Sequence, residues 1–326
     1  MKNIYINSQG GLGFNLALSH ILPEIKAEYE RVCVLSPYFD VFEASPHVDA
    51  VYRPQELRDF IFDAKNDDAR LICERMYDSE DFIYKKVSYA DAWRKAAGLP
   101  LRGNKSGSDT KASLVPLRKY PFIRQGLDTV LGGIKGKGYK DFIICQFTGG
   151  QSPLINVPTE EREINGTKQK VPLWDKVPYD YTNEPLKRHY PIDKADEFCR
   201  LFAERHPETA LVMYQLPNEP KPEHAAVFSF LLPYLSYYEL AKLEPCKGTV
   251  SIDSSLQHLV AGVCKSVVIW GHSLPASFGY EYNHNIIQTC RRDDILYFSA
   301  LGPSGARIEY IHPQALVEEV DEYLFF

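Results

Sequence analysis

The sequence predicts a two-domain α/β protein in which two parallel sheets face one another across a cleft. The chain has 326 residues, more than a single hydrophobic core usually holds. Its first part alternates short apolar strands with helices, and a second strand–helix series begins near Phe142. The composition is 44% hydrophobic and 25% charged, which indicates a globular chain. We therefore expect two Rossmann-like domains.

The N-terminal half follows a β-α-β order that indicates a parallel sheet with helices on both faces. Ile4–Asn7 is expected to be a strand, and Leu16–Tyr29 a helix because its apolar residues recur near the 3.6-residue period. Arg31–Ser36 predicts a strand covered on both faces, since its centre is continuously apolar. Asp49–Tyr52 and Ala69–Glu74 predict two further strands.

The pattern fades between Lys105 and Asp141, where Gly, Ser, Pro and Lys accumulate. Gly132–Gly138 is interpreted as the approach to an interdomain linker, because glycine and exposed charge are typical of such segments. This interpretation gives an N-terminal domain over residues 1–138 and a C-terminal domain over residues 139–310. Residues 311–326 are expected to form a closing helix.

The C-terminal half repeats the alternation of strands and helices. The expected strands are Phe142–Phe147, Ala210–Tyr214, Thr249–Ile252 and Ser266–Trp270. The expected helices are Asp193–Arg205, Tyr237–Glu244, Ser255–Cys264 and an amphipathic Pro313–Phe325. Residues 149–188 show little periodicity and predict a long loop.

Charge and cysteine usage narrow the class of protein. The net charge of −6 argues against a surface built as a whole for polyanions. The locally basic stretch Arg118–Lys140 is either a solvated linker or a surface that steers an anionic acceptor. The seven cysteines are scattered without a Cys-x-x-Cys pair, which indicates reduced thiols in the cytoplasm.

No metal-ligand spacing of Cys or His occurs, so neither a metal nor a cofactor is expected. The N-terminus lacks the pattern of a signal peptide, and no apolar run approaches the roughly 20 residues of a membrane-spanning helix. We therefore expect a soluble cytoplasmic protein that is at most peripheral at the inner membrane.

The strongest local signal is the run Thr249–Gly262, in which a strand ends at Asp253, two serines turn the chain and a helix begins. Ligands of open α/β sheets sit at the carboxyl ends of strands, where helix N-termini favour an anion such as a pyrophosphate. Ser254 and Ser255 add hydroxyl donors, and His258 lies in the first helical turn. The alternative is an ordinary helix cap in which Asp253 or Ser254 only satisfies free amides.

This motif reads Asp-Ser-Ser-Leu-Gln-His-Leu from Asp253 to Leu259, and Val267–Gly271 and Pro275 follow it. The order resembles the C-domain signature of the heptosyltransferase-like glycosyltransferases, a family 9-like group with the GT-B fold. Further segments resemble the family's N-domain and the opening of its donor domain. They are Leu22–Ile25, Val32–Leu35, Ser45–Val51, and Ile143–Gln146 with Thr148-Gly149-Gly150. The resemblance covers about half of the chain.

The resemblance implies an enzyme that moves a sugar from a nucleotide-sugar to an acceptor hydroxyl, with inversion and without a metal. The C-domain would bind the donor as a co-substrate, and the N-domain would bind the acceptor. Residues matching the donor diphosphate site are Asp253, Ser254, Ser255, Leu256 and His258, with Thr148 near the phosphates. His258 would also stabilise the leaving diphosphate. Glu219 is either the family's ribose-binding acid or a solvated loop charge.

The loop after the first strand departs from the family, which has an aspartate there as its general base. Gly11, Gly13 and Asn15 would form the acceptor-side loop, but neither Phe14 nor Asn15 accepts a proton at pH 7. An inverting transfer onto an alcohol needs a base within hydrogen-bond reach. The substitute candidate is Asp40 at a strand end, whose alternative role is to form a turn. Weaker candidates are His20 and Glu43.

The sequence supports two classes of acceptor. A glycan such as lipopolysaccharide core follows the family, a modified base in DNA is motivated by the basic stretch alone, and no stable protein partner is implied. His272 or Tyr280 would contact the base or sugar, or only pack. The missing aspartate favours an alternative from another class, a non-catalytic nucleotide-sugar-binding protein. A nicotinamide oxidoreductase is disfavoured because Gly10–Gly13 lacks the dinucleotide-binding spacing.

Overall fold

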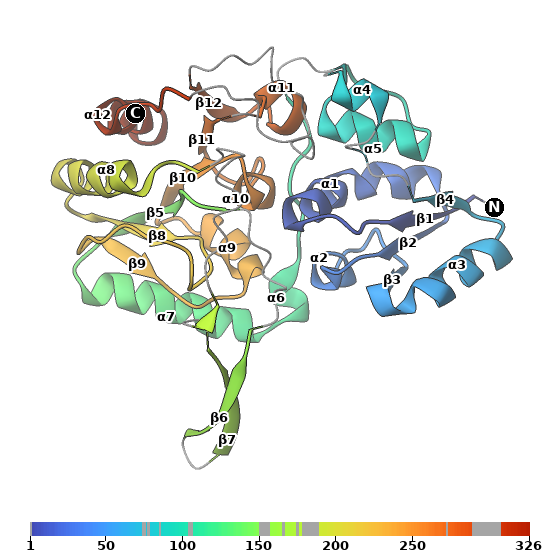
Figure 1. The fold of residues 1–326 in the computed structure, drawn as a ribbon, viewed down its shortest axis with the longest axis horizontal. Helices are drawn as coiled ribbons and strands as arrows, with labels where there is room; N and C mark the ends of the chain where they lie inside the picture. The colour runs from blue at the N-terminus through green and yellow to red at the C-terminus, as the bar shows by residue number, and fades with distance from the viewer. Residues whose placement is uncertain are drawn as a thin grey trace.

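Two parallel sheets with surrounding helices occupy the two halves of the chain and lie side by side in a computed structural model (Figure 1). The structure describes residues 2–73, 76, 79–84, 86–103, 107–149, 157–164, 167–173, 176–177, 189–271, 273–288 and 308–326. All strand pairs within these two sheets are parallel. The predicted α/β fold is confirmed.

The first sheet has the strand order β3-β2-β1-β4. Its strands are β1 (Asn3–Asn7), β2 (Arg31–Leu35), β3 (Ala50–Tyr52) and β4 (Arg70–Ile72). The helices of this half are α1 (Leu12–Glu28), α2 (Phe39–Glu43), a 3-10 turn (Pro54–Glu56), α3 (Leu57–Asn66), α4 (Glu80–Ile83) and α5 (Tyr89–Ala97). The apolar centres of β1 and β2 are buried on both faces, as parallel strands require.

The second sheet has the order β12-β11-β10-β5-β8-β9. Its strands are β5 (Asp141–Gln146), β8 (Thr209–Met213), β9 (Val227–Ser229), β10 (Cys246–Ile252), β11 (Ser266–Trp270) and β12 (Asn283–Ile287). Its helices are α6 (Pro116–Lys119), α7 (Phe122–Gly136), α8 (Ile192–Arg205), α9 (Tyr234–Ala241), α10 (Ser255–Leu259), α11 (Pro275–Phe278) and α12 (Pro313–Val320), which a π-helical turn (Asp321–Phe325) extends.

The chain enters the second sheet at β5, builds β8 and β9 on one side, and then returns to build β10, β11 and β12 on the other. The strand order therefore reverses between β5 and β10. In open α/β sheets a ligand binds outside the carboxyl ends of the strands at such a switch point. The topology of the second sheet alone therefore predicts a ligand site at the carboxyl ends of β5 and β10.

The segment Gly132–Gly138 is not a linker, and that prediction is wrong. Gly132, Gly133 and Gly136 lie within α7, whose buried residues Ile123, Leu127, Val130 and Ile134 recur at helical spacing. Gly133 lies beside the Phe230 ring, which a Cβ on that glycine would meet at 3.4 Å. The helix runs along the second half of the molecule (Figure 1). The domain boundary at residue 138 stays a prediction.

The connection between the two halves includes residues 107–115, an extended segment held to the second half by backbone bonds. Ser108 forms an isolated parallel bridge with Tyr280, and the Ala112 N–H donates to the Ala261 carbonyl at 2.8 Å. The Tyr282 hydroxyl also donates to the carbonyl of Thr110.

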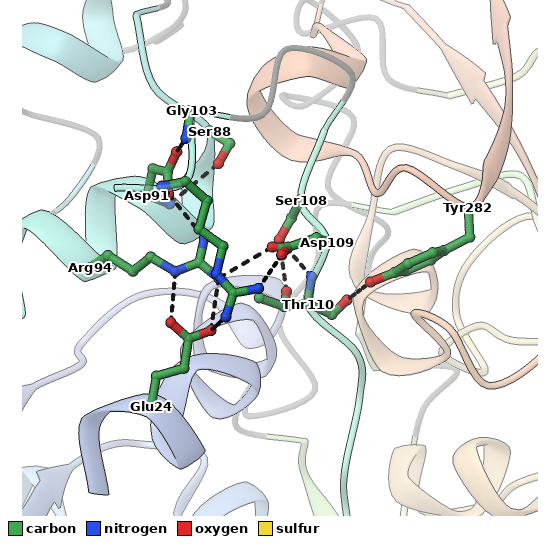
Figure 2. A network of polar contacts seen from close by, with 10 residues as sticks. Glu24, Ser88, Asp91, Arg94, Gly103, Ser108, Asp109, Thr110 and Tyr282 are labelled. Carbon is green, nitrogen blue, oxygen red and sulfur yellow. Dashed lines mark hydrogen bonds and ion pairs between the residues drawn. The ribbon is translucent and has the colours of Figure 1, made fainter. Parts of the chain in front are cut away.

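A buried arginine fixes the start of this connection to the first half (Figure 2). Arg94 of α5, 1% exposed, donates to Glu24 of α1 at 2.8 and 2.9 Å, to Asp91 at 2.9 Å and to Asp109 at 3.2 Å. Asp91 also accepts the backbone N–H of Gly103 at 2.9 Å. We call Glu24, Asp91, Arg94 and Asp109 the Arg94 cluster. It ties α1 and α5 to the connecting segment.

Two other sequence predictions need correction. Within the loop expected over residues 149–188, β6 (Thr159–Ile164) and β7 (Thr167–Pro172) form an antiparallel hairpin that projects from the body (Figure 1). The helix expected over Ser255–Cys264 ends at Leu259, and the following Gly262 adopts a φ of 66°, a left-handed conformation typical of helix ends.

One hydrophobic core is shared between the two halves. It joins Leu16 and Leu22 of α1 and Trp93 of α5 to Leu256 of α10 and Trp270 of β11. The amphipathic C-terminal helix is present, with Leu316, Val317, Val320 and Leu324 buried, and it packs against α8. In the part of the chain that the structure describes, no helix is both long and apolar enough to cross a membrane.

Candidate active site

A cavity of about 280 Å³ lies at the carboxyl ends of β10, β5, β8 and β9, at the switch point of the second sheet. Its polar part is lined by Gln146, Gly149, Tyr214, Gln215, Glu219, Ser254 and Ser255. Its apolar part is lined by Leu216, Pro217, Phe230, Leu231, Leu232, Pro233, Tyr234 and Tyr237. Leu12, from the first half of the chain, also reaches it. The cavity is thus polar at β5 and β10 and apolar at β9.

Gln146, the last residue of β5, holds the turn that begins α10. Its Nε2 donates to the Ser254 hydroxyl at 3.1 Å, and its Oε1 accepts the Leu256 N–H at 3.2 Å. Ser255 shares a 3.1 Å hydrogen bond with the Tyr214 hydroxyl. The two predicted serines therefore line the cavity, whereas the Leu256 side chain is fully buried in the core. Sequence reasoning missed Gln146, whose signal was its place at the end of a central strand.

Gly149 matters because it sits close to this turn. A Cβ there would lie 2.8 Å from the Ser254 hydroxyl oxygen. Any larger residue would press on the turn, so the glycine allows β5 and α10 to approach at the polar end of the cavity.

Asp253 and His258 do not line the cavity. The Asp253 carboxylate accepts a 2.6 Å hydrogen bond from the Gln257 amide, one helical turn further on. His258 is buried, and its Nδ1 lies 2.7 Å from the Tyr280 hydroxyl. That hydroxyl lies 3.2 Å from Nδ1 of His20, so the three side chains form a chain between the two halves. Their roles as donor contacts stay predictions.

The same arrangement bears on two other predicted residues. Burial first, and then the neighbouring His258, lower the pKa of His20 to about 3, which makes it a poor base at neutral pH. Tyr280 is 2% exposed and contacts the two histidines rather than the cavity. His272 lies outside the described residues.

Thr148 and Glu219, which the sequence assigned to different parts of a donor, lie together. Glu219 accepts the Leu216 N–H at 2.9 Å and a hydrogen bond from the Thr148 side chain. Burial raises the pKa of this carboxyl to about 7, against the effect of both hydrogen bonds. Gln215 also lines the cavity, and neither polar atom of its buried amide has a hydrogen-bond partner among the described residues.

Asp40, on α2 in the first half of the chain, does not line the cavity but contacts a residue that does. It accepts a hydrogen bond from the hydroxyl of Tyr234, which lines the cavity from α9. Burial raises the pKa of Asp40, and the Tyr234 bond opposes that shift. Glu43 instead accepts the Tyr120 hydroxyl at 2.7 Å, and this bond holds the pKa of Glu43 low.

Asn15 uses every hydrogen-bonding site of its amide inside the glycine-rich loop. Its Oδ1 accepts the hydroxyls of Ser8 at 2.8 Å and Ser36 at 2.7 Å. Its Nδ2 donates to the carbonyls of Gly10 at 3.1 Å and Gly11 at 2.9 Å. Because a carboxylate cannot donate, only the amide satisfies this loop. Gly13 lies nearby in α1, where a Cβ would be 2.9 Å from the His258 ring.

No protein-family model and no curated protein matches the sequence. Solved structures do match it over almost its whole length. The E. coli ADP-heptose lipopolysaccharide heptosyltransferase II is 12% identical, with 99% of this chain and 98% of that chain covered and a TM-score of 0.57. A glycosyl transferase family 9 protein from Veillonella parvula is 12% identical, with 99% and 97% covered and a TM-score of 0.59.

The E. coli heptosyltransferase WaaC, solved with ADP, is also 12% identical, with 98% and 99% covered and a TM-score of 0.51. The chain has the heptosyltransferase fold. In this GT-B fold the two Rossmann-like halves correspond to the two parallel sheets. The resemblance inferred from the motif after β10 is confirmed at the level of the fold.

Only some of the site residues predicted from the sequence line the cavity. Ser254, Ser255 and Glu219 line it, while Thr148 and Asp40 contact residues that do. Among the described residues, no lysine or arginine lines the cavity. Within the same residues, no cluster of three or more His, Cys, Asp or Glu side chains is placed to hold a metal ion.

Proposed function

We propose that this protein is a glycosyltransferase that uses a nucleotide-sugar donor. The observation that carries the proposal is the graded cavity at the switch point of the second sheet, polar at β5 and β10 and apolar at β9. A nucleoside diphosphate changes from polar to apolar in the same way, with phosphates at one end, ribose in the middle and a base at the other. The shared fold with proteins described as heptosyltransferases supports this assignment.

Each part of the donor has a counterpart in the cavity. The diphosphate would lie against the hydroxyls of Ser254 and Ser255, with Thr148 nearby. The ribose hydroxyls would donate to Glu219 between the two ends. The base would pack on the apolar wall formed by Phe230, Leu231 and Leu232.

The proposed reaction is an inverting transfer that needs no bound metal. Asp40 takes the proton of the acceptor hydroxyl as its oxygen bonds to the anomeric carbon. The bond from that carbon to the diphosphate breaks, and the nucleoside diphosphate leaves with the electron pair. His258 acts as a positioning residue, because its ring lies against Gly13 of α1 where α1 packs on α10.

The acceptor we favour is a glycan rather than DNA. The basic stretch Arg118–Lys140 is partly neutralised, since Lys119 pairs with Glu43 and Lys140 with Glu208. Such pairing weakens the attraction of this stretch for a polyanion. We further propose a cytoplasmic protein that is peripheral at the inner membrane and acts there on a lipopolysaccharide-like glycan.

One observation favours a second candidate, a non-catalytic nucleotide-sugar-binding protein. The loop that supplies a base in the resembled family carries Phe14 and Asn15 here, and the Asn15 amide is fully engaged in holding the loop. A binder would hold the donor without turnover, whereas an enzyme would release nucleoside diphosphate slowly even without acceptor.

Binding of nucleotides tests both candidates. Thermal shift and calorimetry are run with ADP, UDP, GDP, CDP and ADP-heptose, since a ligand of the native state raises Tm. We expect one nucleotide to be preferred and Glu219→Ala to weaken its binding about tenfold. Glu223→Ala, at an exposed position outside the cavity, serves as the matched control.

Three results are possible. No shift with any nucleotide overturns the glycosyltransferase proposal. Binding with slow release of nucleoside diphosphate from the donor supports the enzyme. Binding without release, with or without glycan acceptors, supports the non-catalytic protein.

A further inference from the structure

Helix α2 makes two tyrosine–carboxylate bonds to the second half of the molecule. Tyr234 of α9 donates to Asp40, and Tyr120 donates to Glu43 three residues later at 2.7 Å. Both hydrogen bonds join the first half of the chain to the second, but only one of them involves a residue that lines the cavity. Tyr234 lines the cavity, whereas Tyr120 does not.

The hydrogen bond from Tyr234 to Asp40 is of the same kind as the one that an acceptor hydroxyl must make to its base. A phenol O–H that donates to the Asp40 carboxylate makes the hydrogen bond by which an alcohol presents its proton to a base. The backbone N–H groups of Asp40 and Val41 also bond to this carboxylate. The carboxylate is therefore oriented by its own helix, and one oxygen is taken by the tyrosine.

We propose that the Tyr234 hydroxyl is a placeholder for the acceptor hydroxyl at Asp40. The inference rests on the proposed function, with Asp40 as the general base. Without acceptor, Tyr234 occupies the carboxylate and keeps water from it. An acceptor hydroxyl displaces the tyrosine and takes the same hydrogen bond, so that the base becomes available only when the acceptor is present.

The placeholder suppresses a side reaction of the bound donor. If water reached Asp40, the carboxylate would take its proton while the water oxygen bonded to the anomeric carbon. The bond from that carbon to the diphosphate would break, giving free sugar and nucleoside diphosphate. Glycosyltransferases need water excluded for this reason, and Tyr234 would provide that exclusion at the base itself.

The test compares two isosteric variants, Tyr234→Phe and Tyr120→Phe. Each loses one tyrosine–carboxylate bond from α2, but only the first opens the proposed base. With ADP-heptose as donor and no acceptor, we expect Tyr234→Phe to raise ADP release about fivefold, the ratio for a net hydrogen bond of about 1 kcal/mol. Tyr120→Phe should leave the release unchanged. Melting curves confirm that both variants fold.

The pH profile gives a second readout that a purely structural role would not move. The Tyr234 bond holds the pKa of Asp40 down, so the acidic limb of the release rate should move to higher pH in Tyr234→Phe. No such movement is expected in Tyr120→Phe.

The outcomes separate the inference from the function on which it rests. If ADP release is unchanged in Tyr234→Phe but abolished in Asp40→Asn, the placeholder role of Tyr234 is wrong and the proposed transferase activity stands. Release that persists in Asp40→Asn overturns both the base and the placeholder. A wild-type protein that neither binds nor cleaves the donor overturns the proposed function, and the inference falls with it.

Discussion

The contacts of Asn15 explain why the loop after β1 carries an amide where no proton acceptor was found. Sequence analysis found no proton acceptor in the loop after β1, and the structure explains what stands there instead. The Asn15 amide joins two serine hydroxyls to two glycine carbonyls and so fixes the loop. The proposed transferase therefore needs a base from elsewhere, and the candidate Asp40 contacts Tyr234, which lines the cavity.

Glu219 should make stability depend on pH. Its pKa is about 7 in the folded protein, above the ordinary value of 4.5, because burial disfavours the charge. The folded state therefore holds its proton more tightly than the unfolded state. The associated stability is complete below about pH 4.5 and is lost as pH rises through 7. A shift of this size corresponds to a loss on the order of 3 kcal/mol.

The measurement is the free energy of unfolding in denaturant at pH 5 and pH 8, for the wild type and Glu219→Gln. The amide keeps the size of the side chain and an oxygen that can accept the Leu216 N–H. We expect the difference between variant and wild type to grow in favour of Glu219→Gln at pH 8. An equal difference at both pH values would show that Glu219 is ionised in the folded protein throughout.

At the scale of elements, strands were easier to predict than helices. Strands such as Arg31–Leu35 are buried on both faces, so their apolar runs are visible in the sequence. Helix α7 was hidden because its glycines resemble a linker, although Ile123, Leu127, Val130 and Ile134 keep a helical period. The hairpin of β6 and β7 carries mostly charged and polar residues and no apolar alternation, so its pairing left no signal.

Site residues on one continuous segment could be predicted from the sequence, whereas those defined by contacts between distant segments could not. Ser254 and Ser255 follow a strand directly, and general rules for open sheets place them at a ligand. Gln146 and Tyr234 acquire their roles only from neighbours more than one hundred residues away. Nothing local distinguishes such residues from ordinary ones, because their partners are set by tertiary packing.

The Arg94 cluster should govern how firmly the connecting segment is held. In Arg94→Met, Asp91 loses its buried cation, while Glu24 and Asp109 keep only the half-exposed Arg102. Breaking a buried ion pair in this way costs about 3–5 kcal/mol, and we expect a loss of that order in the free energy of unfolding.

The matched control is Arg200→Met on α8. Arg200 pairs with Glu204 one turn away on an exposed surface, and such a pair contributes less than about 0.5 kcal/mol. Equal losses in the two variants would mean that the buried cluster contributes no more than a surface pair.

For the whole molecule, the decisive contact is the approach of α1 to α10. These helices come from opposite halves and share one core with Trp93 and Trp270. His258 is held in that interface by Tyr280, and through it by His20. The two halves are thus joined by close packing at the same helix whose first turn lines the cavity, so a change in their spacing should alter the shape of the cavity.

Gly13→Ala tests that coupling. Alanine inside a helix normally stabilises a protein by up to about 1 kcal/mol relative to glycine. Here the new methyl group would meet the His258 ring at 2.9 Å and 3.4 Å, and hydrogen bonding prevents the ring from moving freely aside. We therefore expect the opposite sign, a lower Tm together with weaker binding of the preferred nucleotide. Gly132→Ala is the control, because this exposed position inside α7 has nothing within 4 Å and should show the ordinary stabilisation. If both alanine variants are more stable than the wild type, α1 and α10 have room to separate, and the spacing of the two halves does not control the cavity.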